Sequence, residues 1–382
     1  MSELSYLEKL LNGTEIEWLP LSSLCKLITT GKLNANAMED NGAYPFFTCN
    51  EEPYRINTYA FDLEAILISG NGSQVGHLNY YNGKFNAYQR TYILGEFNEN
   101  VDIMYLYYYL MHTLKHYIHK NSKKGSVPYI TMPMLENFTF PIPCPDNIEK
   151  SLAIQSEIVR ILDTFTTLTA ELTAELTARK KQYSYYRDQL LSFDDGEVEW
   201  KTLGELAENL DSKRKPITSG LRETGKIPYY GASGIVDYVR DYIFDGDYLL
   251  VSEDGANLIA RNTPIAFSIS GKTWVNNHAH VLKFETYAER KYVEYYLNSI
   301  DLTSYISGAA QPKLNKKNLE SIKIPNPAPK EKERIVAILD KFDTLTNSIT
   351  EGLPREIELR QKQYEYYRDL LFSFPKPESV NN

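Results

Sequence analysis

Two loops that combine lysines with glycine and proline are the strongest candidates for binding chemistry in this sequence of 382 residues. Their candidate contact residues are Lys120, Lys123, Lys124 and Tyr129 in the first loop, and Gln311, Lys313, Lys316 and Lys317 in the second. Lysines in such loops suit contact with DNA phosphates, and Tyr129 or Gln311 could lie nearer the bases. Because a single charge cluster is usually only a solvated loop, it is the repetition in both halves of the chain that favours DNA contact.

A third basic run, Lys213-Arg214-Lys215, opens the second half of the chain and has no counterpart in the first half. Contact with DNA phosphates and a plain solvated run are both open interpretations for it. The sequence does not indicate which side chains would read bases.

Two other polar series have spacings that could hold a metal ion, although neither is typical of a metal site. The first is a set of histidines on one predicted helical face: His112, His116 and His119. The second is a set of acids: Asp245, Asp247, Glu253 and Asp254. The histidines lack a carboxylate or cysteine at a characteristic spacing, so we interpret them as a polar helix face. The acids lie in Gly-Asp contexts typical of strand-end turns. His278 and His280 alternate as in a strand.

Motifs for catalysis are missing from the sequence. Gly271-Lys272-Thr273 is similar to the end of a phosphate-binding loop, but Ala266 stands where that loop requires a glycine. The sequence has no Asn-Pro-Pro-aromatic motif of amino-methyltransferases, no glycine-rich cofactor fingerprint and no complete Walker loop. We therefore expect no catalytic centre, no metal ion and no cofactor in this chain.

The composition is that of a globular protein, with 42% hydrophobic and 24% charged residues. No apolar run approaches the roughly 18 residues needed to cross a bilayer, and the three cysteines lie far apart. We therefore expect a cytoplasmic protein that does not enter a membrane. The formal net charge of −9 opposes DNA binding. Positive charge must then be local or be supplied by partner subunits.

Internal repetition is the strongest signal in the sequence. Six blocks recur in the same order at an offset near 180. The clearest of them are Glu15–Trp18 with Glu197–Trp200, Phe61-Asp62 with Phe244-Asp245, Pro141 and Pro143 with Pro325 and Pro327, and Lys181–Asp188 with Lys362–Asp369. Residues 18–150 and 200–330 share only scattered landmarks, whereas 151–193 and 331–374 agree closely. This unevenness indicates two modules that do the same task on different targets, mounted on a common frame.

Each copy combines a mixed α and β module with a long amphipathic connector helix. The apolar residues of the connectors recur at three- and four-residue spacings, and they are Ile158, Ile161, Phe165, Leu168, Leu172 and Leu176 in the first, and Ile335, Ile338, Phe342, Leu345 and Ile349 in the second. Such a stripe must pack against another helix, and the other connector is the obvious partner. Gly352-Leu353-Pro354 should interrupt the second helix. The N-terminal segment resembles the end of a connector, so the two chain ends should meet and give a ring-like molecule.

These features together resemble the DNA-specificity subunits of type I restriction-modification systems over nearly the whole chain. The resemblance rests on two variable domains, each followed by a similar helix, and on the connector endings at 181–193 and 362–374. It rests further on Thr169–Leu176, two tandem copies of Thr-Ala-Glu-Leu, a unit that resembles one branch of the family specifically.

The resemblance implies an α+β fold in which two similar target-recognition domains are separated by long antiparallel coiled-coil helices, with pseudo-two-fold internal duplication. The expected division is 1–17 for a segment completing the frame, 18–150 for the first recognition domain, 151–193 for the first connector, 194–330 for the second recognition domain, 331–374 for the second connector, and 375–382 for a tail. Each recognition domain would read one half of an asymmetric site in double-stranded DNA. Two methyltransferase subunits and restriction-translocase subunits would join the frame and carry the catalysis.

The tandem tract Thr169–Leu176 is a candidate ruler, with Thr169, Leu172, Thr173 and Leu176 at its repeating positions. One four-residue unit adds about 6 Å of helix, against about 3.4 Å per base pair of DNA. Its alanine, leucine and glutamate are strong helix formers, and a leucine at every fourth position maintains a seam. The number of units should therefore set the distance between the two half-sites.

Two other functions remain open from the sequence. A stand-alone methyltransferase or nuclease with an unrecognised site would act as a purified chain. A two-headed coiled-coil scaffold would bind proteins instead of DNA, and the net acidity favours it while the repeated basic loops oppose it.

Overall fold

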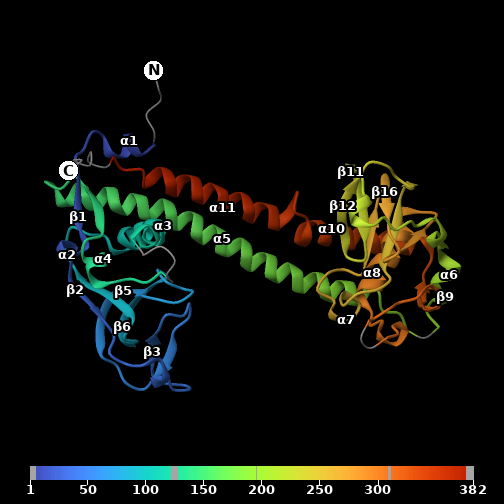
Figure 1. Ribbon diagram of the computed structural model, residues 1–382, viewed down its shortest axis with the longest axis horizontal. Coiled ribbons are helices and arrows are strands. Elements are labelled where there is room, and N and C mark those ends of the chain that lie inside the picture. The colour runs from blue at the N-terminus through green and yellow to red at the C-terminus, as the bar shows by residue number, and fades with distance from the viewer. Residues whose placement is uncertain (1–5, 122–127, 195, 309–310, 376–382) are drawn as a thin grey trace. The chain divides into compact units, whose positions relative to one another are not determined.

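The computed structural model describes residues 6–121, 128–194, 196–308 and 311–375 (Figure 1). The chain divides into two compact units, which are residues 1–171 with 357–382 (unit 1) and residues 172–356 (unit 2). Within the described ranges, no helix is long and apolar enough to cross a membrane. Each unit thus contains one of the variable sequence modules together with parts of both connectors.

Unit 1 is built on one six-stranded mixed sheet. Its strand order is β2 (Cys25–Thr30), β7 (Thr91–Phe97), β5 (Phe61–Ser69), β6 (Leu78–Ala87), β3 (Tyr44–Phe47) and β4 (Tyr54–Ile56). A separate antiparallel pair joins β1 (Ile16–Pro20) to β8 (Thr139–Pro143), with Trp18 opposite Pro141. The helices are α1 (Tyr6–Leu11), α2 (Leu21–Leu24), α3 (Ile103–Asn121) and α4 (Met132–Glu136).

Unit 2 carries two four-stranded sheets. One has the order β10 (Glu208–Asn209), β17 (Ala279–Lys283), β14 (Tyr248–Ser252), β15 (Ala266–Ile269), and the other β12 (Gly234–Val239), β11 (Thr224–Gly231), β16 (Lys272–Val275), β13 (Phe244–Asp245). The pair of β9 (Glu199–Thr202) with β18 (Lys323–Asn326) sets Trp200 opposite Pro325. The helices are α6 (Leu203–Leu206), α7 (Asn257–Ala260), α8 (Tyr287–Ser299) and α9 (Lys316–Glu320).

The two units have one topology, which confirms the duplication. If β13 with β14 and β15 with β16 are each counted as one interrupted strand, the strand order of unit 2 becomes that of unit 1. The interruption lies at Gly246 and Gly271, whose backbone φ angles are positive and whose N–H and C=O groups bond to each other in both directions. Glycine adopts such angles without a steric penalty, so the strands bend there while the two chains stay paired.

The connector helices belong to the cores of the units. The first connector is α5 (Ile148–Leu190), and the second is α10 (Pro329–Asn347) followed by α11 (Gly352–Leu371). In unit 1, α5 buries Ile158 and Leu162 completely, and in unit 2, α10 buries Ile335 and Leu339 completely. Burial of one such side chain contributes about 1.5–3 kcal/mol, so each module is held on its connector mainly by apolar packing.

The second connector breaks where the sequence predicted, since α10 ends at Asn347 and α11 begins at Gly352. Gly352 has a φ of +79°, and a Cβ atom there would lie 2.3 Å from the carbonyl oxygen of Thr344. The apolar stripe predicted for this connector was wrong at Ile349. This residue lies in the break and is 81% exposed, because the helical periodicity stops two residues before it.

The helix pairing follows the prediction that each connector packs against the other. In unit 1, Phe165 of α5 stacks on Tyr367 of α11 with ring centroids 5.3 Å apart. In unit 2, the equivalent Phe342 of α10 stacks on Tyr186 of α5 at 5.7 Å. The start of each connector therefore pairs with the end of the other, which is an antiparallel arrangement.

The chain ends meet in unit 1, as the sequence predicted. Leu7 and Leu11 of α1 share a core with Leu371 and Phe372 at the end of the second connector. In addition, the Trp18 indole N–H donates a hydrogen bond to the carbonyl of Pro375 at 3.0 Å. The N-terminal segment thus completes the frame of unit 1 as the end of the first connector does in unit 2.

A tyrosine-to-aspartate hydrogen bond ties each module to its connector. The Tyr108 hydroxyl of α3 donates to the carboxylate of Asp163 on α5. Likewise, the Tyr295 hydroxyl of α8 donates to Asp340 on α10 at 2.5 Å. Burial raises the pKa of both phenols, and the hydrogen bond to the carboxylate raises it further, so both remain donors at neutral pH.

We expect Tyr108→Phe to lower the free energy of unfolding of unit 1 by about 2 kcal/mol, because it leaves the Asp163 carboxylate without this donor. Tyr107→Phe is the matched control, since the Tyr107 hydroxyl makes only a long bond of 3.5 Å to Leu78. Hydrogen exchange of the α3 backbone amides, measured by mass spectrometry, should become faster in the variant and so reports the loss of stability within unit 1. Equal losses for the two variants would contradict the role of the Tyr108–Asp163 pair.

Candidate nucleic-acid interface

The first predicted basic loop connects α3 to α4 in unit 1. Lys120 is exposed in the last turn of α3 and lines a cavity of about 380 Å³ with Trp18, Tyr109 and His116. Tyr129, at the other end of the loop, is 44% exposed. Lys123 and Lys124 lie outside the described residues. The described part of the loop therefore offers one exposed cation and one exposed aromatic ring.

The second basic loop connects α8 to α9 at the equivalent place in unit 2. Gln311, Lys316 and Lys317 are exposed, and the two lysines open α9. Lys316 pairs with Glu320 one helical turn further on, at 3.6 Å. Lys313 is half-exposed, and its ammonium lies 3.1 Å from Glu253. The predicted residues of this loop thus share one stretch of surface, with Lys313 partly engaged inside the unit.

Both loops are anchored to their sheets in the same way. The backbone N–H of Ile130 in unit 1 donates to the carbonyl of Gly70, and that of Leu314 in unit 2 donates to the carbonyl of Glu253. In turn, the carbonyl of Ile130 accepts from the Tyr92 hydroxyl at 2.8 Å, and that of Leu314 faces the Nε2 of His280 at 2.7 Å. The end of each basic loop is therefore fixed to the equivalent point of its own unit's sheet, although the side chains that fix it differ.

The three residues of the run Lys213-Arg214-Lys215 lie in different environments in the structure. Lys213 and Lys215 are exposed, whereas the Arg214 side chain is 12% exposed and turned inward. Its guanidinium lies 2.6 Å from Glu253 and 3.3 Å from Asp211, and it also donates to the carbonyl of Ala279 at 2.8 Å. This placement gives Arg214 a positioning role and leaves the two lysines as the surface cations.

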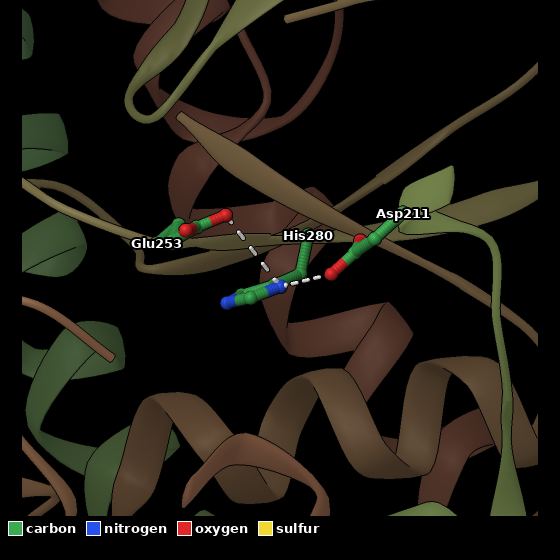
Figure 2. A group of neighbouring side chains, drawn as sticks. All are labelled: Asp211, Glu253 and His280. Carbon is green, nitrogen blue, oxygen red and sulfur yellow. Dashed lines mark hydrogen bonds and ion pairs between the residues drawn. The ribbon is translucent and has the colours of Figure 1, made fainter. Parts of the chain in front are cut away.

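Arg214 belongs to a buried charge network that the sequence did not reveal. Figure 2 shows its acidic and imidazole members, Asp211, Glu253 and His280. The His280 Nδ1 lies 2.6 Å from Asp211 and 3.9 Å from Glu253, and its side chain is 1% exposed. Because Lys313 also pairs with Glu253, this carboxylate joins two basic segments that lie about a hundred positions apart in the sequence.

The network keeps both carboxylates ionised. Burial by itself would raise the pKa of Asp211, but its hydrogen bond to His280, the backbone N–H of Val281 and the charge of Arg214 together lower it. For Glu253, burial is likewise outweighed by the Arg214 hydrogen bond, the charge of His280 and the Lys313 hydrogen bond, so its pKa is lowered too. The positive side chains therefore more than offset the cost of burying the two acids.

The ligand atoms of Asp211, Glu253 and His280 lie within 4.8 Å of one another, a spacing that could hold a metal ion. The chemistry of the group does not fit one. The Arg214 guanidinium already occupies the position of the counter-cation between the two carboxylates. In addition, both ring nitrogens of His280 are already engaged inside the protein, Nδ1 by the Asp211 carboxylate and Nε2 by the Leu314 carbonyl.

The other predicted polar series also resolve into separate contacts. Among the four acids of the second half, Asp247 pairs with Arg290 at 3.3 Å and Asp254 with His278 at 2.8 Å. On α3, His112 stacks on Phe372 with centroids 5.7 Å apart. Burial, followed by the charge of Arg368, lowers the pKa of His112. These contacts hold each unit together. The spacing of the acids and histidines in the sequence could not by itself distinguish such structural contacts from a metal site.

The comparisons with known proteins agree on one family. The protein-family model described as type I restriction modification DNA specificity domain matches residues 14–179 and again residues 196–359. The specificity subunit of the Escherichia coli type I restriction enzyme EcoR124I/EcoR124II is 41% identical over 413 aligned positions, which cover 100% of both chains. The E. coli EcoprrI specificity subunit is 39% identical and covers 92% of this chain and 93% of its own length.

Solved structures show the same fold. The S subunit of a type I restriction-modification system from M. genitalium has a TM-score of 0.61 at 18% identity, covering 96% of this chain and 98% of its own. A chain from a structural study of complex assembly and conformational transition in the type I R-M system has a TM-score of 0.59 at 13% identity, covering 94% and 97%.

We expect Glu253→Gln to lower the free energy of unfolding of unit 2 by about 3–5 kcal/mol, because it leaves the buried Arg214 guanidinium without one of its two carboxylates. Asp254→Asn is the matched control, since it removes the neighbouring carboxylate from a pair with the half-exposed His278 and should cost less than about 1 kcal/mol. Urea unfolding of the purified chain measures both. A loss for Glu253→Gln no larger than for the control would contradict the network.

The same network predicts an acid-dependent loss of stability. A carboxylate whose folded pKa is lowered contributes stability above its ordinary pKa and loses it as the pH falls through the folded value. The difference in unfolding free energy between the native chain and Glu253→Gln should therefore be full at neutral pH and shrink below the ordinary Glu253 pKa of 4.5. Urea titrations at several pH values test this, and a difference that grew on acidification would contradict the assignment.

Proposed function

Because this chain belongs to the family of type I restriction-modification DNA specificity proteins, we propose that it reads a split, asymmetric site in double-stranded DNA, with one half read by each unit. The observation that carries the proposal is the repetition of one recognition module. Both units have the same strand order, and both fix a basic loop to the same point of the sheet through Ile130 or Leu314.

The proposed DNA contacts are the exposed residues of these loops. Lysines neutralise phosphates and set the register, while sequence is read by groups that reach the base edges. We assign phosphate contact to Lys120, Lys213, Lys215, Lys316 and Lys317, and keep Lys123 and Lys124 as candidates on sequence grounds. Tyr129 and Gln311 are the candidates nearer the bases. Lys313 and Arg214 hold the loops of unit 2 in place through Glu253.

The proposed partners are two methyltransferase subunits and the restriction-translocase subunits of a type I complex, which would perform the catalysis. We propose that this chain is itself non-catalytic and acts in the cytoplasm, where such a complex meets DNA. The pairing of its acidic clusters with arginine, lysine and histidine supports a structural use of those acids. The net charge of −9 then matters less, because the repeated basic loops supply positive charge locally.

The proposed spacer ruler lies inside one uninterrupted helix, since Thr169–Leu176 falls within α5. Leu172 and Leu176 are half-buried there, while Ala174 and Glu175 are exposed. One Thr-Ala-Glu-Leu unit occupies about one turn of this helix, so adding or removing a unit changes its length by about 6 Å and returns the seam to nearly the same face.

We expect deletion of Thr173–Leu176 to shorten the spacer by one or two base pairs and to leave both half-sites unchanged, because about 6 Å corresponds to nearly two base-pair steps. The methylation pattern of cells that carry the deleted chain with its methyltransferase reads both quantities at once. Substitution of these four residues by four alanines is the control of equal length. An unaltered spacer in the deletion, or a change in the bases recognised, would refute the ruler.

The proposed function itself is tested by single-molecule methylome sequencing. Cells with the methyltransferase gene and this chain are compared with cells that lack this chain alone. A split, asymmetric, adenine-methylated motif that disappears with the chain is the expected result. If no split motif depended on the chain, DNA reading would be refuted, and the alternative of a two-headed protein-binding scaffold would replace it.

A further inference from the structure

Among the described residues, each unit has one lysine stacked on an exposed tyrosine, away from the basic loops. In unit 1, the Lys84 ammonium lies 4.7 Å from the ring centroid of Tyr59. In unit 2, the Lys272 ammonium lies 4.6 Å from the ring centroid of Tyr242. The two rings are 46% and 45% exposed, and both lysines are exposed. We call these the two Lys–Tyr pairs.

The two pairs occupy the same position in the duplicated fold. Lys84 on β6 stands opposite Asp62 on β5, and Lys272 on β16 stands opposite Asp245 on β13. Each tyrosine precedes its aspartate by three residues. The strands with the lysines also pair in parallel with β3 and β11, where Phe46 faces Asn86 and Tyr229 faces Trp274. The register around each pair is therefore the same in both units.

This agreement is unusual, because the modules have diverged elsewhere. Two positions after the lysine, unit 1 has Asn86 and unit 2 has Trp274. The strand is also continuous before Lys84 in unit 1 but interrupted before Lys272 in unit 2. A cross-strand lysine beside a tyrosine has survived this divergence at an exposed position, where it adds nothing to the core. Retention of an exposed cation in two modules that read different sequences favours contact with a feature common to both targets.

The chemistry of the pair suits an anion that arrives from solvent. Among the residues that the structure describes, each ammonium contacts a tyrosine ring and neither makes an ion pair within 4.0 Å, so both can accept a new partner. The aromatic ring holds the lysine side chain over its face and limits its rotamers. The opposing aspartates, Asp62 and Asp245, lie across the strand pair and weaken the local positive charge.

In unit 2 the pair lies on the same side of its strand as one of the proposed DNA contacts. Lys272 and Trp274 are two positions apart on β16, so their side chains project from the same face. The Trp274 indole N–H donates to the carbonyl of Lys215 at 2.6 Å. The exposed segment that contains Lys213 and Lys215 is thereby fixed next to the face that carries Lys272.

We propose that Lys84 with Tyr59 and Lys272 with Tyr242 form a matched pair of DNA phosphate contacts, one in each unit, that is independent of the sequence read. This inference rests on the proposed function and adds to it a contact on the sheet, separate from the α3–α4 and α8–α9 loops. Phosphate contact by the same residue in both units would set the two modules in the same register on the duplex. The modules could then diverge at the base-reading positions and keep a common docking geometry.

The test uses the chain assembled with its methyltransferase subunits. The probes are a duplex that carries the split motif found by methylome sequencing and an unrelated duplex of equal length. Dissociation constants are measured over a range of salt concentrations for Lys84→Gln, Lys272→Gln and the double variant. The matched controls are Lys26→Gln on β2 and Lys283→Gln on β17, which remove the same charge from exposed strand positions in unit 1 and unit 2.

Each single variant should weaken binding to both duplexes several-fold, and the slope of log K against log salt should lose about 0.9 for each phosphate contact removed. Lys84→Arg and Lys272→Arg, which keep the charge, should retain the native slope, and the methylated motif should stay the same in all variants. Slopes and affinities equal to those of the control variants would overturn the inference, as would a change of motif. If the native complex itself failed to bind the split site, the proposed function would fall first, and the inference with it.

Discussion

Apolar burial of the connector helices inside the modules is the constraint on which the rest of this structure depends. Ile158 and Leu162 of α5 are fully buried in unit 1, as are Ile335 and Leu339 of α10 in unit 2. Each connector is therefore part of a module's core, and the tyrosine-to-aspartate bonds fix its rotation about its own axis. A module that shares its core with a helix must follow that helix, which is the physical basis on which a change of helix length could change the DNA spacer.

Charge is distributed in two distinct ways. The surface lysines of the loops are the proposed phosphate contacts. The guanidinium of Arg214, in contrast, is paired with Asp211 and Glu253 inside unit 2. A buried ion pair of this kind is a poor source of stability compared with apolar packing, but it costs several kcal/mol to break. Its effect here is to tie the loop after Lys213 and the loop at Lys313 to one carboxylate, so that two distant segments keep a fixed spacing.

In the described part of unit 1, a similar geometry is reached without a buried charged side chain. Tyr92 stands where unit 2 has His280, and each holds the carbonyl at the end of a basic loop, that of Ile130 or of Leu314. The duplicated modules have thus kept the backbone positions that present the loop and have exchanged the side chains that secure it. Divergence of this kind is what two modules need in order to read different sequences from one frame.

The sequence by itself determined the duplication, the connector helices and their break at Gly352, because repetition, helical periodicity and the conformational limits of glycine and proline can all be read from residue types and their order along the chain. Tertiary structure alone decided that Arg214 turns inward while Lys213 and Lys215 stay at the surface. Asp211 lies three residues before Arg214, but Glu253 and His280 come from two further segments, and no local pattern marks their convergence. The repeated Lys–Tyr pairs were likewise hidden, since a cross-strand register is set by how strands pair and is not written in the spacing along the chain.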